Sequence, residues 1–565
     1  MRIKASIVAA VILLIAGIPS TALAAKSFRQ VNPAALRAME DDGKELAIID
    51  PREEGVFGES HLLHAVNIPL SKLDFTISRM VPQKTTRIVL TDGGEGMSQR
   101  AAAKLNELGY NNLVIMEGGY PAWKKAGYEV FSGMSVVGKA FGEWVVEHYG
   151  TPTISPEELH KRIAAGESVI VLDSRPPNEY SNMNIPGSIN VPGSELVYRF
   201  SQLGVKSDTL VVVNCAGRTR SQLGAQSLIS AGVPNKVVAL QGGTMAWYVA
   251  GFELEHDSTR HAPEPWGRNL QKALEAAENV AARAGVKTID TTQLEAFKAD
   301  KNRTLYIIDV RTIDEYRAGH RPDSTYGWGV QLVQGMDKFA ATRNARLVLV
   351  DNYMVRALMT ASWLVQADWP ETYVLANPVE GVILATGDYK PVVPGIEHIK
   401  LAGIEPVELN GLLQTKKTTV IDVANSLAYE SGHIPGAWFV VRSRLEESLK
   451  ILPRSSNFVV TGDDSSLIVL TARDLAQISG KQVSILHGGN AAWRKAKLPL
   501  KSGLENLASR ADDMARHPYR TGREPMTPEF RKAANAYFAW ELQLPEQLER
   551  AMETNFKLPV AEAKK

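Results

Sequence analysis

The same pattern occurs four times in this chain, and the repetition limits the possible folds more than any other feature of its 565 residues. In each copy an apolar stretch ends in an aspartate, and a loop follows 40 or 42 residues later. The aspartates are Asp50, Asp173, Asp309 and Asp422. The loop positions that follow them are Asp92, Cys215, Asp351 and Gly462. Intervals this similar indicate four copies of one structural unit.

Each copy has the alternating pattern of an α/β fold. Continuous apolar stretches, such as residues 170–173 and 236–240, alternate with stretches that carry small and apolar residues at helical spacing, such as residues 223–228. Strands of this kind are typical of a parallel sheet that helices cover on both faces. We therefore expect four tandem α/β domains, each a parallel sheet flanked by helices, and a C-terminal helical extension.

Polar, glycine-containing and proline-containing stretches indicate the domain boundaries. The predicted domains are residues 27–133, 150–256, 269–395 with a helical connector at its start, and 403–502. Residues 503–565 form the predicted helical extension, which contains Tyr537, Trp540 and several leucines. We interpret it as a C-terminal cap, and a partner-binding helix is the alternative.

The amino-terminal residues 1–24 have the pattern of a cleavable signal peptide. Arg2 and Lys4 precede an apolar stretch at residues 7–18, and residues 22–24 fit a small-residue cleavage site. The apolar stretch is shorter than the roughly 20 residues of a membrane-spanning helix. The pattern predicts a periplasmic or secreted protein without a stable membrane span after cleavage, and a permanent anchor is the alternative.

Composition argues against several other functions. The net charge is +1 with 22% charged residues, so nucleic-acid binding has no electrostatic support. The eleven histidines show no Cys-His spacing typical of a metal site, and no phosphate-binding glycine loop occurs. We expect neither a metal nor a dissociable cofactor.

The second loop contains the only cysteine of the chain, Cys215, which follows the apolar residues 211–213 and Asn214. Gly217 allows the backbone to curl so that consecutive N–H groups point inward, and a helix beginning near Ser221 adds its positive end. An anionic sulfur would be stabilised there. Arg218 and Arg220 place two guanidinium groups at the edge of this loop, and such groups bind the anionic groups of a substrate well. We expect Cys215 to be the nucleophile. The predicted substrate-binding residues around it are Ala216, Gly217, Arg218, Thr219, Arg220, Ser221 and Arg175.

In combination, these motifs resemble the rhodanese domain, the fold of a family of sulfurtransferases. The matching residues in the second copy are Asp173, Arg175, Glu179 and Tyr180, then Ile185 to Gly187, the cysteine loop, and Gly242 with Trp247. The resemblance implies that Cys215 carries sulfur as a persulfide between a small anionic donor, thiosulfate by default, and an unknown thiol or protein acceptor. It also implies that Asp173 and Trp247 support the loop. For Arg175 an ion pair with Asp173 is the alternative to substrate binding.

The chain also departs from the family pattern. Met183-Asn184 replaces the usual Gly-His in the second copy, Ala424 replaces an arginine in the fourth, and three copies lack the cysteine. A persulfide carrier or scaffold within a sulfur-relay complex is therefore a second hypothesis. Reversible oxidation of the lone thiol is a third. Cysteine phosphatases have arginine six residues after the cysteine, and Ser221 stands at that position here.

Overall fold

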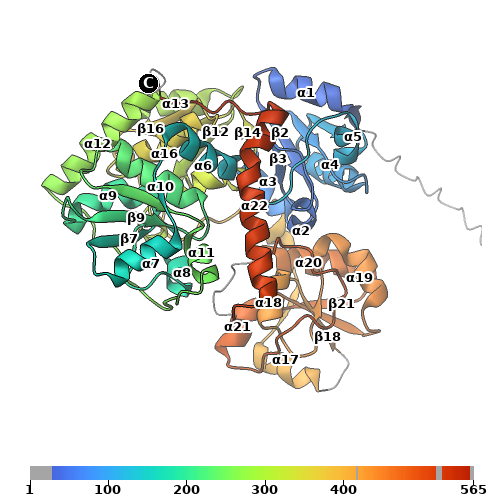
Figure 1. Ribbon diagram of the computed structural model, residues 1–565. Coiled ribbons are helices and arrows are strands. Elements are labelled where there is room, and N and C mark those ends of the chain that lie inside the picture. The colour runs from blue at the N-terminus through green and yellow to red at the C-terminus, as the bar shows by residue number, and fades with distance from the viewer. Residues whose placement is uncertain (1–27, 415–417, 517–524, 560–565) are drawn as a thin grey trace, which may run out of the picture.

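The computed structural model describes residues 28–414, 418–516 and 525–559, and these residues form four sheets, one from each repeat (Figure 1). Within the repeats, all strand pairs are parallel. The predicted α/β fold with repeated parallel sheets and a C-terminal helix is confirmed. The predicted signal peptide at residues 1–24 lies outside the described residues. None of the described helices is long and apolar enough to cross a membrane.

The sheet of the first repeat has the order β1-β5-β4-β2-β14, and β3 also pairs with β2. Its last strand, β14, comes from the third repeat and runs antiparallel to β2. The elements of this repeat are β1 (Arg29–Val31), α1 (Pro33–Asp41), β2 (Leu46–Asp50), α2 (Glu54–Phe57), β3 (Ala65–Asn67), α3 (Leu73–Met80), β4 (Ile88–Leu90), α4 (Met97–Glu107), β5 (Leu113–Met116) and α5 (Gly119–Lys125).

A 14-residue helix, α6 (Val136–Tyr149), connects the first repeat to the second, whose sheet has the order β6-β10-β9-β7-β8. Helix α7 begins with a proline directly after Ser155, whose side chain accepts a hydrogen bond from the Glu158 N–H and so caps the helix. The elements are β6 (Thr153–Ile154), α7 (Pro156–Ala164), β7 (Val169–Asp173), α8 (Pro177–Asn182), β8 (Ile189–Asn190), η1 (Gly193–Glu195), α9 (Leu196–Phe200), η2 (Ser201–Leu203), β9 (Leu210–Asn214), α10 (Thr219–Ser230), β10 (Val237–Leu240) and α11 (Gly243–Val249).

The third repeat begins with an amphipathic helix and has the sheet order β11-β16-β15-β12-β13. Its elements are α12 (Arg268–Ala284), β11 (Lys287–Ile289), α13 (Thr291–Ala299), β12 (Leu305–Asp309), α14 (Ile313–Ala318), β13 (Thr325–Tyr326), α15 (Gly329–Gln334), η3 (Met336–Lys338), β14 (Thr342–Arg343), β15 (Arg346–Val350), α16 (Val355–Gln366) and β16 (Thr372–Leu375).

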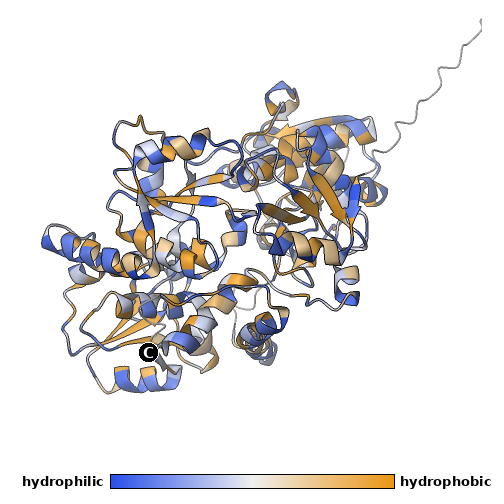
Figure 2. Ribbon diagram, turned by 90° about the horizontal axis from the view of Figure 1, so that it is seen from above, coloured by the Kyte–Doolittle hydropathy of each residue, from blue (hydrophilic) through white to orange (hydrophobic). Residues whose placement is uncertain are grey.

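The fourth repeat has the sheet order β17-β21-β20-β18-β19. Its elements are η4 (Ile396–His398), β17 (Ala402–Ile404), α17 (Pro406–Leu413), β18 (Thr418–Asp422), α18 (Ser426–Ser431), β19 (Trp438–Phe439), η5 (Arg442–Arg444), α19 (Leu445–Ile451), β20 (Asn457–Thr461), α20 (Ser465–Ser479), β21 (Gln482–Leu486) and α21 (Gly489–Lys495). Apolar residues concentrate on the strands (Figure 2), as expected for sheets that are covered on both faces.

The second and third repeats share one hydrophobic core. Side chains of α9, α10, α12 and α16 belong to the same buried cluster. Trp363 of α16 donates a hydrogen bond from its indole N–H to Ser227 Oγ of α10 at 2.9 Å. The first and fourth repeats meet through polar contacts, among them an ion pair between Arg442 and Asp74 at 2.7 Å.

The C-terminal helix α22 (Pro528–Ala551) runs through the middle of the molecule (red in Figure 1) rather than over the fourth repeat alone. Leu544 and Leu548 pack into a cluster with Leu63, Phe131 and other apolar residues of the first repeat and of α6. Farther toward its amino end, the helix lies on the second repeat, where Arg531 donates a hydrogen bond to the Val249 carbonyl. The helix therefore covers the junction of the first two repeats.

Candidate active site

Cys215 lies directly after β9, where the parallel sheet of the second repeat meets the amino end of α10. Its side chain is only 1% exposed. The thiol donates a weak hydrogen bond to Ser221 Oγ at 3.5 Å, and Ser221 Oγ donates to the Arg218 carbonyl at 2.7 Å. The carboxyl ends of parallel strands are where α/β folds bind ligands.

The Gly-Gly motif and the two residues after it hold the backbone of the cysteine loop. The N–H groups of Thr244 and Met245 donate to the carbonyls of Cys215 and Ala216, at 2.8 and 3.1 Å. Gly243 has a φ of +56°, and a Cβ at this position would lie 2.4 Å from the Cys215 carbonyl oxygen. Only glycine fits both the backbone conformation and the close approach. The motif thus fixes the path of the loop backbone.

Asp173 and Arg175 form a fully buried ion pair beside the loop. The Arg175 guanidinium donates to both Asp173 carboxylate oxygens, at 2.9 and 2.7 Å, and to the Met183 carbonyl at 2.6 Å. This geometry fits the ion-pair alternative, and substrate binding by Arg175 stays a prediction. Trp247, the other predicted support residue, is buried and donates its indole N–H to the Glu253 carbonyl at 2.8 Å.

Both arginines of the loop already have carboxylate partners. Arg218 donates two hydrogen bonds to Glu143 of α6, at 2.5 and 2.8 Å. Arg220 donates two to Glu179 of α8, both at 2.8 Å, and lies 3.4 Å from the Gln331 amide oxygen of the third repeat. Burial alone would raise the pKa of Glu179, but the Arg220 guanidinium holds it below its ordinary value. Donor binding by these two arginines, predicted from the sequence, would have to share them with these carboxylates.

Helix α22 forms a wall of the site with a buried carboxylate. Glu541 is 1% exposed, and its Oε1 accepts a hydrogen bond from Thr219 Oγ1 at 3.1 Å. Its Oε2 has no hydrogen-bond partner among the described residues. A Cβ placed on Gly217 would lie 3.7 Å from this oxygen and 3.8 Å from the ring of Tyr537. The carboxylate therefore lies directly beside the cysteine loop.

Helix α6 contributes a buried amine to the same wall. Lys139 is 3% exposed, and its Nζ lies 5.2 and 4.6 Å from the ring centroids of Tyr537 and Trp540. Burial lowers the pKa of Lys139 to about 8, although the charge of Glu541 opposes the shift. Burial likewise raises the pKa of Glu541, and Lys139 opposes that shift. Two opposite charges are thus held between α6, α22 and the loop.

In two of the cysteine-free repeats a carboxylate occupies the loop position. Asp92 accepts hydrogen bonds from the N–H groups of Gly94 and Ser98, both at 2.8 Å. Asp351 accepts them from the N–H groups of Arg356 at 2.8 Å and Tyr353 at 3.4 Å. The loop backbone therefore binds an anionic side chain at the position of the cysteine. An ionised sulfur at this position could accept hydrogen bonds from neighbouring N–H groups in the same way.

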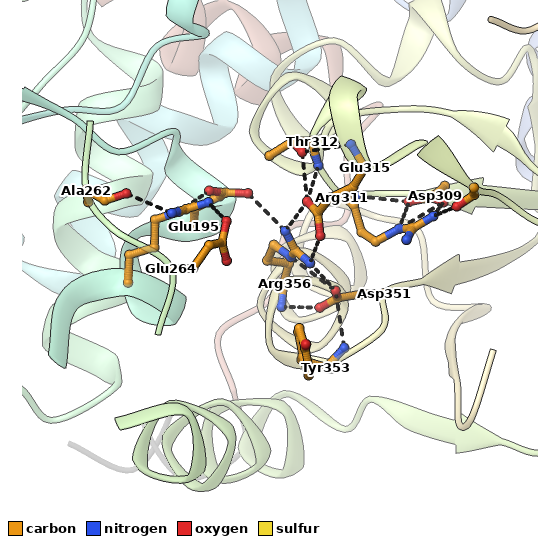
Figure 3. Close-up of polar contacts among 12 residues, drawn as sticks. Glu195, Ala262, Glu264, Asp309, Arg311, Thr312, Glu315, Asp351, Tyr353 and Arg356 are labelled. Carbon is orange, nitrogen blue, oxygen red and sulfur yellow. Dashed lines mark hydrogen bonds and ion pairs between the residues drawn. The ribbon is translucent and has the colours of Figure 1, made fainter. Parts of the chain in front are cut away.

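In the third repeat, residues around the loop position contact the second repeat (Figure 3). The fully buried guanidinium of Arg356 donates to Asp351 at 2.8 Å, to Glu315 at 2.7 and 2.9 Å, and to Glu195 of the second repeat at 3.1 Å. Glu195 also pairs with Arg199. The charges of these residues compensate one another, and the ion pair between Arg356 of α16 and Glu195 links the two repeats.

The fourth repeat has no side chain at the loop position, because Gly462 stands there. Asp463 pairs with Arg494 at 2.8 Å, and Asp464 caps α20 by accepting from the Leu467 N–H. Both aspartates therefore have structural partners.

A separate group of carboxylates and imidazole lies outside this site. Ligand-type atoms of Glu40, His64 and Glu553 lie within 4.8 Å of one another. Arg37 pairs with Glu553 at 3.0 Å. The three side chains come from α1, from the segment before β3 and from the segment after α22, so no sequence spacing indicated the group.

The sequence also did not indicate Lys139, Glu143 or Glu541 as neighbours of the cysteine loop. They lie on helices 76, 72 and 326 residues away from Cys215 in the chain. None belongs to a motif, and their burial is decided by the packing of α6 and α22. A lysine or glutamate on an otherwise apolar helix face is the one signal that sequence reading offers.

Comparison with known families matches residues 32–126, 155–250 and 405–496 to the rhodanese-like domain. A solved structure of a thiosulfate sulfurtransferase from Pseudomonas aeruginosa is 40% identical, with a TM-score of 0.88, over 94% of this chain and 100% of its own.

Two curated proteins match shorter segments. A sulfurtransferase of Allochromatium vinosum is 32% identical over 101 residues, which are 18% of this chain and 92% of the relative. The HTH-type transcriptional regulator Rv0324 of Mycobacterium tuberculosis is 33% identical over 108 residues, 19% of this chain. The chain spans only 46% of that regulator's length.

Proposed function

Because the chain belongs to the rhodanese-like family of sulfurtransferases, we propose that it transfers the outer sulfur of thiosulfate through a persulfide on Cys215. One observation carries the proposal. Cys215 stands at the loop position where the carboxylates of Asp92 and Asp351 accept backbone hydrogen bonds. A thiolate or persulfide at this position would be stabilised by the same kind of N–H groups.

The proposed reaction has two displacement steps. After losing its proton to solvent, the Cys215 thiolate attacks the outer sulfur of thiosulfate, the sulfur–sulfur bond of the donor breaks, and sulfite leaves with the electron pair. The sulfur then remains on the enzyme as a persulfide. An acceptor nucleophile such as cyanide attacks the terminal sulfur, the persulfide bond breaks, and thiocyanate and the Cys215 thiolate are released. Splitting the transfer into two steps in this way is nucleophilic catalysis.

The test is the mass and the turnover of the purified protein. Incubation with thiosulfate should add about 32 Da to the chain, one sulfur atom, and Cys215→Ser should abolish the addition. Thiocyanate should form from thiosulfate and cyanide with the parent protein and not with the variant. A chain that neither gains sulfur nor forms thiocyanate would contradict the proposal.

A persulfide carrier that passes sulfur to a protein partner is the second candidate. The three cysteine-free repeats and helix α22 beside the cysteine loop support it, because they add surface that a single sulfur-transfer loop does not need and that a protein partner can bind. Sulfur loading without release to cyanide or small thiols would support this candidate over the enzyme. In either case we propose that the protein acts in the periplasm or outside the cell, which the pattern of residues 1–24 supports.

A further inference from the structure

We propose that the Glu541 carboxylate occupies the binding position of the donor's anionic group, and that an incoming donor displaces it and binds between Thr219 and Lys139. The inference rests on the proposed function and names the part of the site that recognises the donor. It assigns to Lys139 the charge recognition that the sequence assigned to Arg218 and Arg220.

The position of Glu541 is that of an anion at the site. Its carboxylate accepts a hydrogen bond from the loop hydroxyl of Thr219 at 3.1 Å and lies beside Gly217, two residues from the nucleophile. A buried carboxylate oxygen without a hydrogen-bond partner is unfavourable. Glu541 Oε2 has no such partner among the described residues. Displacing this carboxylate therefore costs little hydrogen bonding.

Lys139 is the cation that a donor could use. Arg218 and Arg220 each bind a carboxylate through two hydrogen bonds. The Lys139 amine instead faces the rings of Tyr537 and Trp540, with Glu541 as its strongest opposite charge. A sulfonate or another small anion that replaced the carboxylate would give this buried amine an anionic partner.

The helix has a weak point next to Glu541. Pro545 lies inside α22, four residues after Glu541, so the Glu541 carbonyl lacks the N–H donor that continues an α-helix. On the carboxyl side, Leu544 and Leu548 hold the helix in an apolar cluster. The part before Pro545 could thus move away from the loop while the rest stays anchored.

Alkylation of Cys215 tests the site without requiring sulfur transfer. Negatively charged iodoacetate and neutral iodoacetamide are compared as rates on the full chain. Glu541→Gln keeps the shape and the acceptor oxygen but removes the charge, and we expect the iodoacetate-to-iodoacetamide rate ratio to rise about tenfold. Lys139→Gln should lower the ratio by a similar factor. Glu546→Gln, on an exposed position of the same helix, is the matched control and should leave the ratio unchanged.

Sulfur transfer gives the second readout. The KM for thiosulfate should fall in Glu541→Gln and rise in Lys139→Gln. Unchanged rate ratios and KM values in folded variants would overturn the inference even if Cys215 carries sulfur. Changed alkylation ratios in a chain that takes up no sulfur would instead retain the anion site and overturn the proposed function.

Discussion

At the scale of single residues, one loop position explains how four similar domains differ. Cys215, Asp92 and Asp351 all follow a buried strand and precede a helix. An aspartate there accepts the loop hydrogen bonds permanently and cannot carry sulfur, whereas a cysteine can react. In the third repeat the aspartate also compensates the charge of the buried Arg356.

Arg356 should be essential for stability, since three carboxylates surround its guanidinium. Arg356→Met would remove the cation that these carboxylates share and leave the buried carboxylate of Asp351 without its ion-pair partner, and we expect a loss of about 3 to 5 kcal/mol in the free energy of unfolding. Urea unfolding followed by fluorescence measures it. Arg317→Met removes an exposed ion pair of the same repeat and should cost less than about 1 kcal/mol. Equal losses in the two variants would refute this account.

Gly243 should tolerate no side chain. In Gly243→Ala the new Cβ would lie 2.4 Å from the Cys215 carbonyl oxygen, so the loop has to shift. We expect a stability loss of about 2 kcal/mol or more and at least a tenfold loss of sulfur transfer. Gly232→Ala has the same positive φ penalty but open space around the Cβ, and it should keep its activity. Normal activity of Gly243→Ala would show that the loop position is not critical.

At the scale of the element, α6 combines a structural and a chemical role. Its residues Phe141 and Val145 lie in the core that the second and third repeats share, while Lys139 and Glu143 face the cysteine loop or its cover. Burying an amine opposes folding, because the charged form loses its hydration. Lys139 therefore lowers the stability of the fold at the position that we propose binds the donor's anionic group.

The pH dependence of stability should show this destabilisation by the buried Lys139 amine. The folded pKa of Lys139 is about 8, below its ordinary value of 10.5, so the burial penalty is complete below pH 8 and disappears as the pH rises to 10.5. The charges around the amine are Glu541, Lys338, Asp337 and Arg220. Lys139→Met should raise the Tm at pH 7, and the gain should shrink between pH 8 and 10.5. A gain of the same size at every pH would contradict the burial of a charged amine.

The sequence predicts the repeated α/β domains, but it does not predict which side chains and which helix pack against the cysteine loop. The strand that ends at Asp173, the glycine pair at 242–243 and the helix after Cys215 follow from local patterns of period and turn chemistry. The partners of Arg218 and Arg220 do not, because an ion pair between distant helices leaves no periodic signal. The helix at 528–551 could be expected as a helix, but its place over the second repeat depends on tertiary packing.

At the scale of the whole molecule, the second and third repeats share one hydrophobic core, and we expect them to unfold together. Trp363 of the cysteine-free repeat packs near Phe141 and Tyr149 and donates a hydrogen bond to Ser227 of α10, the helix that follows the active loop. A cysteine-free repeat of this kind contributes to the site by completing the core under it.

Truncation of this contact should therefore affect both repeats. Trp363→Ala removes a buried aromatic ring, and we expect a loss of about 3 to 5 kcal/mol with faster hydrogen exchange in α10 as well as α16. Hydrogen exchange followed by mass spectrometry measures each helix separately. Trp266→Ala, at an exposed tryptophan, is the control and should leave both helices protected. Faster exchange confined to α16 would show that the two repeats unfold independently.

The strand β14 has a consequence for biosynthesis. It pairs with Leu46 and Ala47 of β2, although the ribosome makes it roughly 300 residues later, which at 5 to 20 residues per second is about 15 to 60 s. During this interval the first repeat has an unfinished edge, and nascent chains with such an edge are substrates for chaperones and sites of mispairing. The amino-terminal quarter of the polypeptide thus reaches its final form only after most of the chain has been translated.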